Sequence, residues 1–386
     1  MITRRQFIGT TGGGLFLTAW PGLQTEADLS SLGNIVVIML EGGLDGLAAV
    51  PPTGDPDLGK RRKHLVPENL IKLSSLFSLH PALKNYAAML SSGNAAIVHA
   101  TSIPYTLRSH FEGQNLMQTG STVPFSHRSG WLGRAMALVG VPGRALSLGM
   151  PLLVRGEGDL DTHYPADIRG ATRPNSKVLQ LLETHHGGGL SQAFNKLREK
   201  DKEQMESSAT SVAARRRDTE GLAYYAGQKL SEPMGPHVAV ITVPGFDTHA
   251  LQGADEGVHP RLLRELDTVF ESFRLGLGEA WSKTIILTLT EFGRTVEENG
   301  SAGTDHGYGT CGLLAGGLLK QARVVSKWPG LGKSDLFERR DLQSTLDYRS
   351  VCAACIGAAF GLDHDVVTER VFGEKTLLDI APLLFS

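Results

Sequence analysis

Four short apolar runs constrain the fold of this chain more than any other feature. They are rich in β-branched residues, which favour buried strands. The runs occupy residues 34–40, 95–98, 237–243 and 284–290. The connection between the last two runs has helical periodicity, so the segment is expected to form a βαβ unit with parallel strands. The pattern therefore predicts an α/β fold built on a sheet of parallel strands.

Just past its carboxyl end, each run is followed by Asp, Glu, His or Ser. Parallel strands bring these ends to one edge of the sheet, where ligands bind in open α/β folds. Carboxylates and imidazoles together are suitable ligands for divalent cations. Each motif alone is weak, because Asp and His are common in turns, but the set is large enough for two cations. The candidate metal ligands are Asp45, Asp247, His249, Glu291, Asp305 and His306.

Two residues beside these candidates have alternative interpretations. Arg294 follows Glu291 by three residues. It either clamps an anionic group through two hydrogen bonds or forms a salt bridge with Glu297 or Glu298. His259 lies at the predicted start of a helix. It either reaches the metal edge or caps the turn.

Residues 1–27 are expected to be an export signal. Arg4 and Arg5 precede a short, Gly-rich, weakly apolar segment, which is typical of a twin-arginine signal. The alternative is the ordinary basic start of a cytosolic chain. The signal predicts the twin-arginine translocase as a partner and a periplasmic or extracellular location. No stretch reaches the roughly 20 apolar residues of a transmembrane helix, so no stable membrane span is expected.

The overall composition excludes several classes of protein. The net charge of −2 gives no indication of a nucleic-acid surface. Three cysteines are too few for a disulfide framework, and Cys311, Cys352 and Cys355 are expected to pack in the core. Without the signal, residues 28–386 are enough for one large domain or two lobes.

Local signals predict three helices and a cap. The first helix begins at His80-Pro81 and runs to about Met89. The second begins at His259 and has apolar residues at helical spacing through Phe273. The third lies in residues 341–361. Segments within about residues 130–235 are expected to form a cap or insertion. The basic run 215–217 inside it is either an anionic-partner site or part of a solvated helix.

The combined motifs resemble those of a bacterial exported family called domain of unknown function 1501, and the resemblance covers nearly all of the chain after the signal. The motifs are Gly42-Gly43-Leu44-Asp45-Gly46, Arg108-Ser109-His110-Phe111-Glu112, Gly130-Trp131-Leu132-Gly133-Arg134, Phe246-Asp247-Thr248-His249, Glu291-Phe292-Gly293-Arg294 and Gly303-Thr304-Asp305-His306-Gly307.

The resemblance implies membership of the alkaline phosphatase-like superfamily, which includes phosphatases, sulfatases, phosphodiesterases and phosphomutases. The implied fold is an α/β/α sandwich with a mostly parallel sheet and two metal ions at its strand ends. The positions that match the metal ligands are Asp45 (with Glu41 as the alternative), Asp247, His249 and His306. Where the superfamily has an Asp-His pair, this chain has Glu291 and Phe292. That departure leaves the second ion without a complete ligand set.

The superfamily's nucleophile matches the region of Ser109 and His110. In many members a Gly in a small-residue turn follows the nucleophile by ten residues, and here Gly120 follows His110, not Ser109, by ten. With a shift of one residue Ser109 is the nucleophile. His110 is instead a metal ligand, a general base or the nucleophile, and in a further alternative both residues only cap the helix. Arg294 would hold the remaining oxygens of the substrate.

The expected function is an exported metal-dependent hydrolase of small anionic phosphate or sulfate esters. Its expected cofactor is one or two divalent ions, with zinc first and magnesium, calcium or manganese as alternatives. The alternative function is a metal-containing extracytoplasmic binding or assembly protein with the same fold. Fold analogy alone does not distinguish the two.

Overall fold

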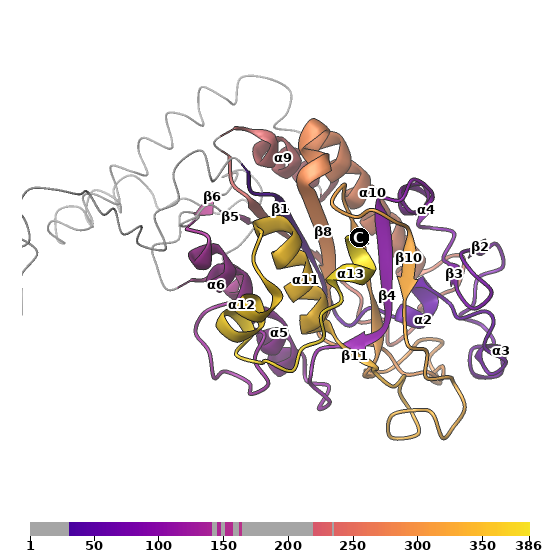
Figure 1. The fold of residues 1–386 in the computed structure, drawn as a ribbon. Helices are drawn as coiled ribbons and strands as arrows, with labels where there is room; N and C mark the ends of the chain where they lie inside the picture. The colour runs from indigo at the N-terminus through magenta and orange to yellow at the C-terminus, as the bar shows by residue number, and fades with distance from the viewer. Residues whose placement is uncertain (1–30, 141–144, 148–150, 157–161, 164–218, 234) are drawn as a thin grey trace, which may run out of the picture.

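The central sheet of the computed structural model contains all four predicted strands (Figure 1). The structure describes residues 31–140, 145–147, 151–156, 162–163, 219–233 and 235–386. The four strands are β1 (Asn34–Glu41), β4 (Ala95–Ser102), β7 (Val238–Pro244) and β8 (Thr284–Leu289). Apart from residues near the strand ends, their side chains are buried on both faces, which explains their nearly continuous apolar sequences.

β1 lies at the centre and pairs in parallel with β7 on one side and β8 on the other. Among the described residues, the strand order is β10-β4-β9-β8-β1-β7-β5-β6, with β11 paired to β4. The antiparallel member is β9, which lies between β4 and β8. The other strands are β5 (Ala145–Ser147), β6 (Thr162–His163), β9 (Thr310–Ala315), β10 (Arg323–Val325) and β11 (Leu346–Asp347).

Helices cover both faces of the sheet, as the alternation of side chains along β1 requires. Ile35 and Val37 pack into one core, together with residues of α5 (His110–Thr119), α6 (Trp131–Leu138) and α11 (Tyr348–Phe360). Val36 and Ile38 pack into the other core, with residues of α4 (Lys84–Ser91), α9 (Thr219–Ser231) and α10 (Val258–Leu277). The predicted α/β/α sandwich with a mostly parallel sheet is therefore confirmed.

Shorter elements complete the described chain. The short helices are α2 (Gly46–Ala49), α3 (Leu58–Arg61), α12 (His364–Val367) and α13 (Ala381–Leu384). β2 (Ile71–Lys72) and β3 (Ser78–Leu79) form a separate antiparallel ribbon. Single turns of 3-10 helix occupy Leu152–Val154 and Gly278–Lys283, and a π turn occupies Thr368–Phe372.

The three predicted helices all form, but two of them start later than predicted, since α11 begins at Tyr348 instead of near residue 341. α4 begins at Lys84, three residues after Pro81, because the His80 ring accepts a hydrogen bond from the Ala82 amide (3.0 Å) and holds these residues in a turn. α10 begins at Val258, as its apolar periodicity predicts. The three cysteines are buried and free, which confirms their packing role.

Some predictions fall on residues outside the described ranges. They are the signal at 1–27, the basic run 215–217 and much of the cap within 130–235. The extent of the domain, 28–386, also stays a prediction. Among the described residues, no helix combines the length and apolarity needed to cross a bilayer.

Candidate metal centre

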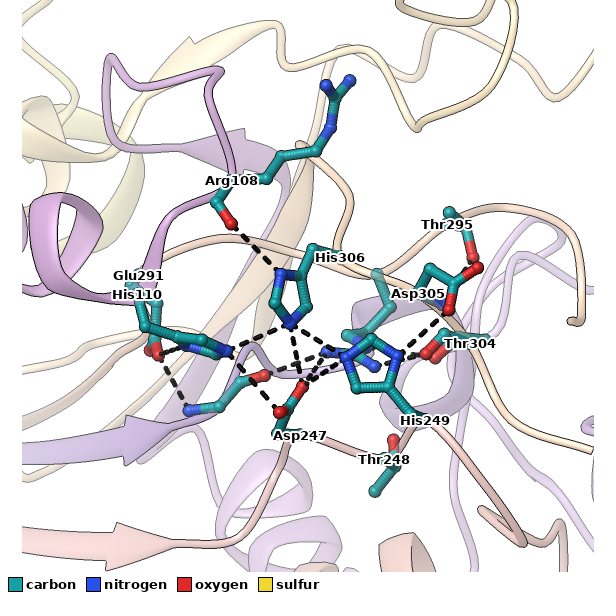
Figure 2. Close-up of polar contacts among 12 residues, drawn as sticks. Arg108, His110, Asp247, Thr248, His249, Glu291, Thr295, Thr304, Asp305 and His306 are labelled. Carbon is teal, nitrogen blue, oxygen red and sulfur yellow. Dashed lines mark hydrogen bonds and ion pairs between the residues drawn. The ribbon is translucent and has the colours of Figure 1, made fainter. Parts of the chain in front are cut away.

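Segments that are far apart in the sequence meet at the carboxyl edge of the sheet (Figure 2). His110 is the first residue of α5, which follows β4. Asp247 and His249 follow β7. The loop from β8 to β9 leaves this edge and returns to it, because β9 runs antiparallel to β8. That loop carries Glu291 and His306, so the predicted convergence of strand ends is confirmed for this part of the chain.

Three imidazole rings lie around one carboxylate. The Nε2 atom of His306 lies 3.0 Å from Nε2 of His110 and 3.0 Å from Nε2 of His249. Oδ1 of Asp247 is 3.0 Å from Nε2 of both His306 and His249. Its Oδ2 is 3.6 Å from Nε2 of His110. The ligand atoms of His110, Asp247 and His306 all lie within 4.8 Å of one another.

The opposite nitrogen of each ring faces an acceptor. Nδ1 of His110 donates to Oε1 of Glu291 (2.8 Å), and Nδ1 of His249 donates to Oδ1 of Asp305 (3.0 Å). Nδ1 of His306 donates to the backbone carbonyl of Arg108 (3.1 Å). Carboxylates and carbonyls only accept, so each Nδ1 carries the proton. In the neutral rings the three Nε2 atoms therefore carry lone pairs.

Three imidazole lone pairs and a carboxylate directed at one another repel unless a positive charge lies among them. A divalent cation among them would relieve this repulsion, and histidine ligands commonly donate their other N–H to a carboxylate or carbonyl in this way. The ligand atoms of His110, His306 and Asp247 are close enough together to share one divalent ion. His249 lies beside them, with its Nε2 3.0 Å from Nε2 of His306 and from Oδ1 of Asp247.

The electrostatics of the cluster follow from these contacts. The hydrogen bond from His110 to Glu291 raises the pKa of His110, and burial opposes it. Burial lowers the pKa of His306, while Asp247 acts in the opposite direction. Burial alone would raise the pKa of Asp247, but the hydrogen bond and charge of Arg294, together with the neighbouring histidines, lower it overall. Asp247 is thus charged at neutral pH, as a metal ligand must be.

The buried guanidinium of Arg294 holds the carboxylate of Asp247 in place. Its side chain is fully buried and its Nη1 donates to Oδ1 of Asp247 (2.7 Å) and to the carbonyl of Gly42 (3.1 Å). Another nitrogen donates to the carbonyl of Thr304. Neither alternative from the sequence describes this arrangement, because the partner is Asp247 instead of Glu297, Glu298 or a free anion.

Glu291 and Asp305 lie outside the cluster of converging atoms. Glu291 is fully buried, and its Oε1 accepts from the Gly42 amide (2.9 Å) as well as from His110. Asp305 accepts from Asn299 (3.1 Å) and His249. Both were predicted as ligands, and the structure places them instead against the outer nitrogens of two histidines. In those places they fix the tautomer of each ring.

Asp45 is placed away from the converging atoms, in a buried ion pair. Its Oδ2 accepts from Arg62 and Gln252, each at 2.5 Å, and its Oδ1 caps α2 through the amide of Ala48 (3.2 Å). Burial opposes ionisation, but the neighbouring charges, that of Arg62 foremost, and the hydrogen bonds from Arg62 and Gln252 together outweigh it, so the pKa of Asp45 is lowered. In the structure Asp45 thus belongs to this ion pair and lies outside the cluster around Asp247, and its expected role as a ligand stays a prediction.

The remaining candidate residues have other partners. Ser109 is the residue before α5, and its amide donates to the Tyr105 hydroxyl (3.0 Å). His259 is buried and forms neither of its expected contacts, since both ring nitrogens lack a hydrogen-bond partner in the structure. Gly42 appeared in the sequence only as part of a motif, and the structure shows that no side chain fits there: a Cβ would lie 2.2 Å from the Asp247 amide, and φ is +117°.

Several solved structures are similar to this chain in fold. Similar solved structures include Ps i-CgsB in complex with k-i-k-neocarrahexaose, with 10% identity, 91% of this chain and 76% of that chain covered, and a TM-score of 0.43. They also include the PsFucS1 sulfatase from Pseudoalteromonas sp., with 12% identity, coverage of 94% and 73%, and a TM-score of 0.40.

A third similar structure is the C-terminal periplasmic domain of EcEptC from Escherichia coli in complex with Zn, with 10% identity, coverage of 74% and 73%, and a TM-score of 0.37. No curated protein matches the chain in sequence. Residues 85–372 match the model of a family described as "Protein of unknown function (DUF1501)". Because that match covers most of the chain, the protein belongs to the DUF1501 family.

Proposed function

We propose that this protein is a metal-dependent hydrolase of phosphate or sulfate esters. Its ion is held by Nε2 of His110 and His306 and by the carboxylate of Asp247, with His249 as a further candidate ligand. The observation that carries the proposal is the clustering of imidazole Nε2 atoms around the Asp247 carboxylate, each ring being fixed by an acceptor on its other side.

The exposure of the cluster favours catalysis over a structural role. The side chains of Asp247 and His249 are 41% and 45% exposed, so a substrate can approach the ion from solvent. A divalent ion in this place would polarise an ester oxygen and stabilise the charge of the leaving group. The chain contributes the positions of its ligands: Glu291 orients His110, and Arg294 orients Asp247.

The resemblance of the six motifs to the alkaline phosphatase-like superfamily supports the ester as substrate. Zinc is the expected ion, because three imidazoles and one carboxylate match its preferred ligands. The second candidate function, an extracytoplasmic metal-containing binding protein, has the same ion without turnover. Purification without chelator, metal analysis and a panel of phosphate and sulfate esters test the two. Bound metal with no hydrolysis of any ester would favour the binding protein.

The nucleophile is tested by two neighbouring substitutions. His110 is a proposed ligand, so we expect His110→Ala to abolish hydrolysis. Ser109 is not among the converging side chains, so we expect Ser109→Ala to retain measurable activity, with water as the attacking group. Steady-state kinetics and the metal content of both variants check this. Retained activity in His110→Ala together with none in Ser109→Ala would instead assign a serine mechanism.

Metal affinity is expected to fall as the pH is lowered from 8 to 5. A proton competes with the ion for Nε2 of His110, and Glu291 raises the pKa of His110 above the usual 6.5. The decrease should therefore begin above pH 6.5 and approach about tenfold per pH unit below the raised pKa. In the metal-free protein the sign is opposite. There the His110–Glu291 interaction stabilises the fold fully below pH 6.5, and this stabilisation is lost as the pH rises through the raised pKa.

Competition with a chromogenic chelator across this range measures the effect. Glu291→Gln is the matched variant, because it removes the main cause of the raised pKa and should move the onset to lower pH. An affinity that is constant from pH 8 to 5, or an onset unchanged in Glu291→Gln, would contradict the assignment of His110 as a ligand.

We further propose that residues 1–27 direct export through the twin-arginine translocase. The receptor reads the two guanidinium groups of Arg4 and Arg5, so replacing both by lysine should leave the precursor in the cytoplasm. Cell fractionation with immunoblotting measures this, and a variant with one lysine is the control for expression. Normal extracytoplasmic accumulation of the double variant would overturn the proposal.

A further inference from the structure

A phosphate or sulfate ester bound at the metal centre carries negative oxygens that need donors besides the ion. Arg294 was the expected donor, but its side chain is fully buried and donates to Asp247 and to backbone carbonyls. Arg108 is also committed, since it donates to Asp341 (2.6 and 2.9 Å) and to Glu338 (2.5 Å). Figure 2 shows its guanidinium pointing away from the cluster.

Arg340 differs from Arg294 and Arg108 because its guanidinium is more exposed and only weakly paired. Its Nη2 donates to the backbone carbonyl of His306 (2.9 Å), so the guanidinium lies beside a residue whose ring belongs to the cluster. Its contacts to Asp341 are weak, at 3.3 and 3.4 Å. The side chain is 42% exposed. Its charge also acts on Asp305, which contacts His249.

The turn that carries Arg340 is strained. Glu338 and Arg339 both have positive φ, at 51° and 59°, and the Arg340 amide closes the turn on the Phe337 carbonyl (3.1 Å). Such a turn usually contains Asn-Gly, because other residues are unfavourable there. Strain of this kind is typically found at functional sites, where the surrounding structure maintains it.

The strained turn is fixed on both sides. The amide of Val296 donates to the Arg340 carbonyl (3.3 Å), and Thr295 forms a bridge with Asp341. Arg294, the neighbour of Thr295, forms a bridge with His306. The backbone of Arg340 is thus attached, through one extended segment, to the same loop that supplies a proposed ligand.

We infer that Arg340 binds the non-bridging oxygens of the tetrahedral anion at the metal centre. The inference rests on the proposed function for the anion that is bound, and it adds the residue that recognises it. A guanidinium is suited to this task because its planar fork of donors matches two oxygens of a phosphate or sulfate group. Nη1, which has only weak contacts, is the nitrogen with donors to offer.

Binding of inorganic phosphate and sulfate to the zinc-loaded full chain tests the inference without requiring turnover. Titration calorimetry should show affinities about tenfold weaker in Arg340→Gln, since a hydrogen bond to a charged group contributes about this factor to the affinity. Arg339→Gln is the matched control, because it removes an exposed charge from the same turn. It should change the affinity little. Arg340→Lys should lie between wild type and Arg340→Gln.

Zinc content and thermal unfolding show whether each variant is folded and loaded, and Arg340→Lys serves if Arg340→Gln fails to fold. Equal weakening in Arg339→Gln and Arg340→Gln would overturn the inference, as would unchanged binding in Arg340→Gln or no anion binding by the wild type. Anion binding that depends on Arg340 without hydrolysis of any ester would support the inference and overturn the proposed hydrolase. Ester hydrolysis that is unchanged in Arg340→Gln would support the proposed hydrolase and overturn the inference about Arg340.

Discussion

If the proposed metal site and hydrolytic activity are correct, replacing His306 by alanine is expected to remove both. His306 has the most central ring of the cluster, because its Nε2 lies 3.0 Å from both other Nε2 atoms and from Oδ1 of Asp247. Its loss removes one of the three ligand atoms that lie within 4.8 Å of one another. We expect the metal affinity to fall by at least about a hundredfold, since even outer partners of a ligand contribute about 10–100-fold.

The loss of metal should also lower thermal stability. A ligand at about 100 times its Kd stabilises the folded state by about 2.7 kcal/mol. In zinc-supplemented buffer, the midpoint of thermal unfolding of His306→Ala should match that of the chelator-treated wild type. Elemental analysis and calorimetric unfolding measure the two effects. One equivalent of metal retained by the variant at wild-type affinity would exclude His306 as a ligand.

Two outer variants provide graded controls for this experiment. Glu291→Gln keeps the shape of a buried residue that orients His110, and should weaken metal binding by about 10–100-fold. Asp305→Asn changes the corresponding partner of His249, but Asp305 is half exposed, so water can replace it and the effect should be smaller. An order of effects with His306→Ala greatest and Asp305→Asn least would match the geometry of the cluster.

The sheet could be predicted because its strands are apolar along their whole length. β1 and β8 are buried on both faces, so their sequences have no polar alternation to obscure them. β9 was not predicted, although it is equally buried. It follows a Gly-rich loop, and Cys311 in it was expected only to pack in the core. Its antiparallel direction depends on the path of the loop from β8, which residue composition does not encode.

The location of the site at the strand ends could be predicted from the sequence, but the partners of each side chain could not. Asp45 and Asp247 look alike in sequence, since each is an acidic residue in a turn after a parallel strand. What separates them is the partner: Asp45 meets Arg62 in the core, whereas Asp247 meets Arg294 and two histidines at the edge. Those partners are far away in the chain. Their identity is therefore a property of the tertiary fold, which local patterns cannot supply.

The Asp45–Arg62 pair leads to the second large prediction: Arg62→Met should destabilise the protein by about 3–5 kcal/mol. Both side chains are at most 1% exposed. Arg62 also donates to the carbonyls of Thr295 (2.7 Å) and Val296 (2.9 Å). Methionine has a similar length without donors, so the variant leaves a buried carboxylate with Gln252 and a helix amide as its remaining partners, and two carbonyls that lose their donor.

Urea unfolding in the presence of chelator measures this effect without a contribution from metal. The double variant Arg62→Met/Asp45→Leu is the control, because replacing both partners of a buried pair by apolar residues is often nearly neutral. It should recover a large part of the lost stability, which a double-mutant cycle would report as coupling. The pKa of Asp45 is lowered in the fold, so the contribution of the pair is present above pH 3.8 and is lost as the pH falls through the lowered value. At neutral pH, a loss below about 1 kcal/mol in Arg62→Met would show that the pair is solvated or replaceable, and that the loop bearing Arg294 is held by other contacts.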